Sequence, residues 1–139
     1  RIEPNPTADQ EEHTFTYALY PHAEGWRQAN TVQEAMKLNQ PLLSEEGGHA
    51  GCQNSFVWVD KSNVIIETVK MAEDDDGIIV RLYESENAKT KAHIFFGEKI
   101  SSVESCNCLE EIKQTIETDG EGFEITVKPY EIQTYRVRF

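Results

Sequence analysis

The sequence predicts an all-β fold, an antiparallel β-sandwich of about seven to nine strands with one short helix near the N-terminus. Runs of alternating apolar and polar residues recur through the second half of the chain. Residues that favour tight turns separate these runs about every 8–12 positions, as in sandwich proteins. Helical periodicity is confined to one early segment, whereas strands that alternated with helices would indicate a parallel sheet.

The N-terminal third is expected to hold a linker, one strand and the helix. Residues 1–12 are acidic, proline-containing and aperiodic, which indicates a linker or boundary segment before a domain over 13–139. Residues 14–20 place Phe15, Tyr17 and Leu19 on one face, a pattern typical of a half-buried strand.

The helix is predicted over residues 25–39. Apolar side chains recur there at helical spacing. Pro41 is expected to end the helix, because the residue before a proline is driven out of the α region. The glycine-rich residues 44–54 that follow are expected to form a flexible loop.

The rest of the chain is expected to form consecutive strands, over residues 56–59, 64–71, 78–83, 91–96, 100–106, 123–128 and 130–139. Residues 109–118 fit either a short helix or an edge strand with a loop. Asp119–Gly122 predicts a hairpin turn. The last strand is expected to contain a bulge near Gln133, because apolar residues before and after it lie on opposite faces.

The charge balance excludes several kinds of partner. The 139 residues carry 13 Lys and Arg against 25 Asp and Glu, a formal net charge of −12. Such a chain is a poor ligand for nucleic acid or anionic membranes, whose phosphates select for basic residues. No apolar run approaches the length of a membrane span, and no basic-plus-apolar leader stands at the start. The chain begins with arginine, and we expect it to be part of a longer protein.

The cysteines do not form a disulfide framework. Their number is odd, and the pair Cys106 and Cys108 lacks the second ligand pair that a metal site needs. Together with Cys52 they are expected to be free thiols in a reducing compartment. This expectation indicates a cytoplasmic protein.

The densest group of acids is the EDDDG segment at residues 73–77, with Asp74, Asp75 and Asp76 at its centre. Counted from Asp74, position twelve is a serine rather than the glutamate that an EF-hand calcium loop requires. The segment is therefore expected to be a solvated hairpin turn, with a weak cation or partner contact as the alternative.

The histidines are scattered and show no zinc spacing. His22 precedes the predicted helix, either as a polar group at the helix start or in a ligand-facing or interdomain role. Trp26 and Trp58 are expected in the core, because each lies on an apolar face. No catalytic, cofactor-binding or metal residue is predicted, and His22 and the aspartates 74–76 are the only candidates for a surface or interdomain role.

Three segments resemble the C-terminal β-domain of glycoside hydrolase family 38 α-mannosidases, especially the cytosolic and bacterial branch. They are HTFTYALYPHAEGWRQANTVQEAMKLNQPL (13–42), SNVIIETVKMAEDDDGIIVRLYESEN (62–87) and FEITVKPYEIQTYRVRF (123–139). They occur in the order of the family and span nearly the whole chain.

The resemblance implies a parent enzyme that is a retaining α-mannosidase. Its divalent metal, usually zinc, and its nucleophilic aspartate would belong to an N-terminal domain outside these residues, so no cofactor is expected here. The implied role is a non-catalytic accessory domain, whose partners are the other domains of the same polypeptide and, through the parent, mannose-containing carbohydrate. The alternatives are an independent carbohydrate-binding module for mannosides and an oligomerisation surface.

Overall fold

A computed structural model describes residues 5, 7–8, 10–40, 42–44, 46 and 55–139. The chain divides into two compact units, Arg1–Pro41 and Leu42–Phe139, and each is described here by itself. The predicted boundary between residues 12 and 13 stays a prediction. Most of the expected loop at 44–54 lies outside the described residues.

The first unit contains the predicted short helix, α1 (Thr31–Asn39). It ends before Pro41, as the sequence predicts, but it begins six residues later than expected. Asn30 has a left-handed backbone with φ 51°, and the residues from 26 to 30 form turns. The left-handed residue interrupts the helical path, so the apolar periodicity before it does not extend the helix.

The strand predicted at residues 14–20 is wrong. The segment contains no strand, and its alternating side chains are exposed, with Phe15 at 78%, Tyr17 at 85% and Leu19 at 92%. Alternation indicates which side chains share a face, but a strand also needs a hydrogen-bonded neighbour. The described residues of this unit include no other strand that could pair with it.

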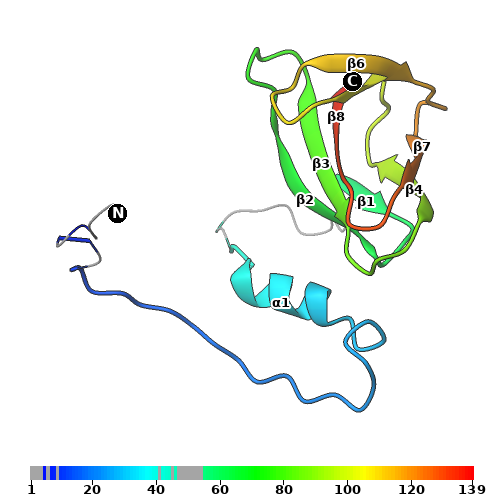
Figure 1. Ribbon diagram of the computed structural model, residues 1–139. Helices are drawn as coiled ribbons and strands as arrows, with labels where there is room; N and C mark the ends of the chain where they lie inside the picture. The colour runs from blue at the N-terminus through cyan, green and yellow to red at the C-terminus, as the bar shows by residue number, and fades with distance from the viewer. Residues whose placement is uncertain (1–4, 6, 9, 41, 45, 47–54) are drawn as a thin grey trace. The chain divides into compact units, whose positions relative to one another are not determined.

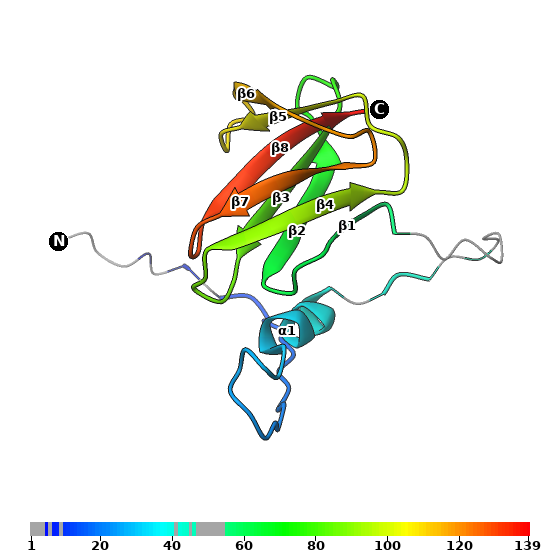
Figure 2. The same ribbon diagram turned by 90° about the vertical axis from the view of Figure 1, so that its right-hand side faces the viewer.

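The second unit is an antiparallel sandwich of two sheets (Figures 1 and 2), which confirms the predicted fold class. One sheet has the order β1–β4–β7 and the other β2–β3–β8–β5–β6. The strands are β1 (Val57–Val59), β2 (Val64–Met71), β3 (Ile78–Glu84), β4 (Thr90–Phe96), β5 (Ser102–Cys106), β6 (Ile112–Ile116), β7 (Gly122–Val127) and β8 (Ile132–Arg138). No described helix is both long and apolar enough to cross a membrane.

The core lies between the two sheets and is built by the predicted alternation. Ile94 and Phe123 from the small sheet meet Leu82 and Val137 from the large sheet, and each is at most 2% exposed. Removing one such side chain from water stabilises the fold by about 1.5–3 kcal/mol. The Phe123 ring lies 4.9 Å from that of Tyr135, so aromatic contacts also join the sheets.

Two predicted local features differ from the structure. Strand β8 pairs with β3 in unbroken register from Ile132 to Val137, so there is no bulge at Gln133. Ile132 lies on the outer face and is 60% exposed. The register shifts occur instead in the β2–β3 and β5–β6 pairings. Asp119–Gly122 joins β6 to β7, which belong to different sheets, so it is a turn between sheets and not a hairpin.

The ambiguous residues 109–118 contain strand β6 at the edge of the large sheet. This outcome selects the edge strand over the short helix. Its side chains are mostly exposed, which explains why the sequence carries no clear strand alternation there.

Candidate functional site

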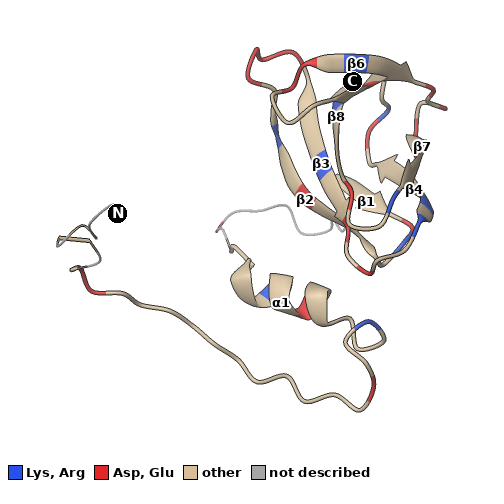
Figure 3. Ribbon diagram, in the orientation of Figure 1, with Lys and Arg blue, Asp and Glu red and all other residues tan. Residues whose placement is uncertain are grey.

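The acidic segment at 73–77 forms the turn between the paired strands β2 and β3 (Figure 3), as predicted. Two of its aspartates are in ion pairs with arginines of β8. The Asp74 carboxylate lies 2.7 Å from the Arg136 guanidinium, and Asp76 accepts two bonds from Arg138 at 2.8 and 2.9 Å. Asp75 is exposed, with φ 60°. The turn is therefore attached to the sheet beside it.

These ion pairs favour the ionised form of Asp74 and Asp76. Hydrogen bonds from Arg136 and Arg138 hold the pKa of Asp74 and of Asp76 below the ordinary range. Arg138 also reaches Glu104 of β5 at 2.7 Å. Carboxylates held ionised by arginine cannot donate a proton as a general acid, and the adjacent positive charges disfavour a bound cation.

His22 belongs to the first unit and is exposed. Its ring lies 5.6 Å from that of Tyr20, and its Nδ1 forms a hydrogen bond with the backbone carbonyl of Glu24. This local turn gives His22 a structural contact of its own. His22 thus belongs to the first unit, and the aspartates 74–76 belong to the second.

A second region, which the sequence reading missed, lies on the outer face of the small sheet. Trp58 of β1 stands opposite Phe95 of β4, and their rings lie 5.4 Å apart at an interplanar angle of 11°. The His93 ring follows, 4.2 Å from Phe95. Trp58 is 42% exposed, so its predicted core position is wrong. Val57 and Val59 pack against the core, and strict alternation therefore turns Trp58 outward.

Trp26 is also not a core residue. It is 40% exposed and lies before the helix in the first unit, with the Arg27 guanidinium 4.7 Å from its ring centroid. Apolar neighbours predict a core position for both tryptophans, but in each case the structure leaves a large part of the side chain exposed to solvent.

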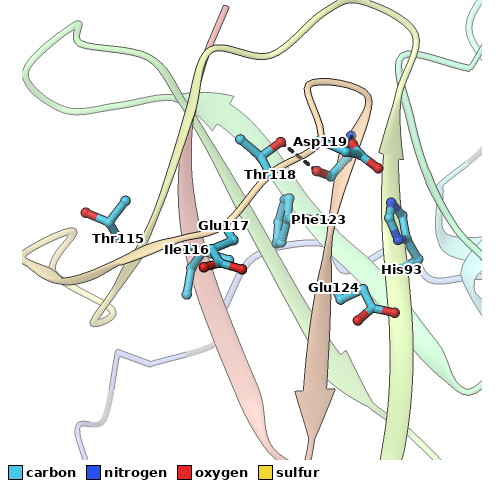
Figure 4. A pocket seen from close by; sticks show the side chains of 9 residues that line it. His93, Thr115, Ile116, Glu117, Thr118, Asp119, Phe123 and Glu124 are labelled. Carbon is cyan, nitrogen blue, oxygen red and sulfur yellow. Dashed lines mark hydrogen bonds between the residues drawn. The ribbon is translucent and has the colours of Figure 1, made fainter.

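Two hollows lie beside the aromatic side chains of Trp58, Phe95 and His93. One, of about 430 Å³, is lined by residues that include Trp58, Phe95, Glu98, Lys99, Asp119 and Glu121. The other, of about 570 Å³, includes His93, Asp119, Phe123 and Glu124 (Figure 4). Asp119 lines both.

Hydrogen bonds within the turn hold the Asp119 carboxylate, which lines both hollows, in place. Asp119 Oδ1 accepts the backbone N–H groups of Glu121 and Gly122 at 2.9 and 2.8 Å, and these bonds lower the pKa of Asp119. Gly122 also leaves room for the histidine ring, because a Cβ there would lie 2.6 Å from His93 Nε2. That Nε2 atom is buried and has no hydrogen-bond partner among the described residues.

Residues 63–135 match the model of the glycosyl hydrolases family 38 C-terminal beta sandwich domain. This match runs from β2 into β8 and covers more than half of the chain. The chain belongs to this family.

The relatives of this family-38 domain are much longer proteins. Alpha-mannosidase G of Dictyostelium discoideum is 30% identical over 96% of the chain, and the mouse alpha-mannosidase 2C1 is 28% identical over 94%. The human alpha-mannosidase 2C1 is 32% identical over 77%. The aligned part spans only 13%, 13% and 11% of these relatives.

The family-38 sandwich also holds a buried carboxylate, at Glu84, which is 0% exposed. Burial raises its pKa, but hydrogen bonds from the Tyr130 and Glu86 backbones and from Asn63 Nδ2 outweigh burial and leave the pKa below its ordinary value. The bonds join the ends of three loops, so Glu84 has a structural role. Within the described ranges, no three His, Cys, Asp or Glu side chains are grouped to hold a metal.

Proposed function

We propose that this domain is a non-catalytic accessory part of a larger α-mannosidase, which hydrolyses terminal α-mannosides by a retaining mechanism. The family match and the names of the three relatives, all alpha-mannosidases, support the parent activity. The domain supplies a rigid sandwich whose partners are the other domains of the same polypeptide.

The electrostatic state of the carboxylates carries the non-catalytic part of this proposal. A glycosidase needs one carboxyl group whose pKa is raised so that it can protonate the leaving group, beside a second, ionised carboxylate. Every described carboxylate with a resolved shift has a lowered pKa instead, namely Asp60, Asp74, Asp76, Glu84, Glu110 and Asp119. Their partners are arginine, lysine, asparagine and backbone N–H groups, as in structural polar networks.

The parent's divalent metal, which we propose is zinc, would lie in an N-terminal catalytic domain outside this chain. The acids of the β2–β3 turn do not fit such an ion, because Arg136 and Arg138 already neutralise them. The mannose-containing substrate would likewise be hydrolysed in the catalytic domain of the parent enzyme. We propose a cytoplasmic location from the free thiols Cys106 and Cys108.

The test is hydrolysis of an aryl α-mannoside by the purified 139-residue chain, with and without added zinc or cobalt. Folding is verified first by circular dichroism and by dispersed amide signals in NMR. We expect no turnover above that of buffer under any condition, and turnover by the full-length parent. Hydrolysis that co-purifies with the isolated, folded chain would overturn the proposal.

A further inference from the structure

The outer face of the small sheet carries a surface that the accessory role does not explain. An exposed tryptophan stands beside a hollow that charged side chains also line. We propose that the hollow beside Trp58 binds the ring of a neutral saccharide with a terminal mannose.

The aromatic part of the site is held in a defined orientation. Phe95 is stacked near-parallel to the Trp58 ring, and His93 packs against Phe95 in turn. The Asp60 carboxylate accepts the backbone N–H of His93 at 2.8 Å and joins the end of β1 to β4. β1 is an edge strand, and among the described strands it is hydrogen-bonded only to β4.

The exposed tryptophan surface has the chemistry to receive a sugar ring. The face of an aromatic ring carries partial negative charge, and the C–H groups on one face of a pyranose carry partial positive charge. Stacking therefore buries the apolar face of the sugar while its hydroxyl groups point outward. The hollow of about 430 Å³ falls within the usual range of ligand pockets, about 300–1,000 Å³.

The polar rim offers partners for sugar hydroxyl groups and disfavours an anionic ligand. Glu98, Asp119 and Glu121 offer acceptors, and Lys99 offers a donor. Each sugar hydroxyl donates and accepts, so it can satisfy both kinds of group. An anionic ligand would face three carboxylates against one ammonium, which disfavours its binding.

One acceptor is set in place before a ligand arrives. Asp119 is fixed by its bonds to two backbone N–H groups, which use Oδ1 and leave Oδ2 without a bond among the described residues. Gly120 keeps this turn tight with φ 89°. A fixed acceptor does not lose side-chain freedom on binding, which favours a small ligand. The choice of mannose rests on the proposed function, whereas binding of a neutral sugar ring rests on the hollow alone.

The test is a titration of the ¹⁵N-labelled chain with methyl α-mannoside and with a mannotriose, followed by amide and indole N–H shifts. We expect saturable shifts at millimolar ligand, clustered at Trp58, Phe95, Gly97, Lys99 and Asp119–Glu121. Trp58→Ala should weaken binding about tenfold or more, as loss of a stacking partner does.

Tyr130→Ala is the matched control, because Tyr130 is an exposed aromatic residue of the same unit, follows the far end of β7 and lines neither hollow. We expect this variant to bind like the wild type. Glu121→Gln is a second test variant in case Trp58→Ala does not fold. The substitution is nearly isosteric and lies at an exposed position that lines the hollow. We expect it to weaken binding severalfold.

Three results would overturn the sugar site. They are the absence of a saturable shift, shifts that map elsewhere, and the same saturable shifts on addition of tetramethylammonium, which would indicate a cation site. Binding of glucosides in place of mannosides would overturn the choice of mannose and leave the accessory role untouched. Hydrolysis by the isolated chain would contradict the accessory role and leave sugar binding untouched.

Discussion

Glu84 is a fully buried carboxylate that binds several hydrogen-bond donors. Its buried carboxylate accepts hydrogen bonds from Asn63 and from the backbones of Glu86 and Tyr130, at 2.8, 2.8 and 3.1 Å. These donors come from three different connections between strands. A buried donor that loses its acceptor costs about 1–3 kcal/mol. The carboxylate is therefore needed because it satisfies several donors at once.

Replacement of Glu84 by glutamine is expected to lower the free energy of unfolding by about 1–3 kcal/mol. The new amide N–H₂ group would point at N–H donors that now bond to a carboxylate oxygen, so those donors would lose their acceptor. Urea unfolding of the chain measures this difference. Glu117→Gln makes the same chemical change at an exposed position and is expected to stay near the wild type. Equal stability of the two variants would show that Glu84 is not a structural acceptor.

Single residues also show where sequence reading fails. Trp58 and its neighbours Val57 and Val59 are all apolar, so hydrophobicity cannot tell which side faces the core. The alternation assigns the valines and Trp58 to opposite faces, but it does not say which face is covered. That choice depends on the opposite sheet, whose position follows from strand pairings far apart in the sequence.

At the scale of elements, the β2–β3 turn is attached to β8 by charge. Arg136 is 6% exposed at its side chain, and Asp74 lies within 2.7 Å of it. Loss of the carboxylate would leave a nearly buried guanidinium without its nearest counter-charge, which is unfavourable. The ion pair therefore stabilises the hairpin against β8, and not only the turn.

Asp74→Asn is expected to lower the melting temperature, whereas Asp75→Asn one residue further is expected to leave it nearly unchanged. Asp75 is exposed, and asparagine tolerates its positive φ as aspartate does. Differential scanning calorimetry of the two variants checks the comparison. If Asp75→Asn destabilises the chain as much as Asp74→Asn, the turn conformation matters and the ion pair does not.

Elements with local signals were predictable. Turn residues and alternation place β2, β3, β4 and β7 within a few residues of their bounds. Signals that depend on pairing failed: residues 14–20 alternate but have no partner strand, and Asp119–Gly122 has hairpin composition but joins two sheets. A turn sequence fixes local backbone geometry, whereas the sheet that the next strand enters is fixed by the core.

At the scale of the molecule, two electrostatic effects act against each other on acidification. The net charge of −12 at pH 7 means that protonation relieves repulsion, which favours the folded state. Protonation also removes the carboxylates that are ion-paired or hydrogen-bonded in the folded state. The second effect is local, over bonds of 2.7–2.9 Å, whereas the repulsion is spread over the surface and is screened beyond about 8 Å at physiological salt.

We therefore expect stability to fall on acidification at physiological salt. The folded-state pKa values of Asp74, Asp76, Glu84 and Asp119 are depressed. Their contribution is complete above the unfolded-state values, about 3.9 for Asp and 4.3 for Glu, and it is lost as pH falls through the folded-state values. The melting temperature should be level near neutral pH and should drop below about pH 4.5. A melting temperature that rises between neutral pH and pH 4 would show that relief of repulsion is stronger than the loss of these bonds.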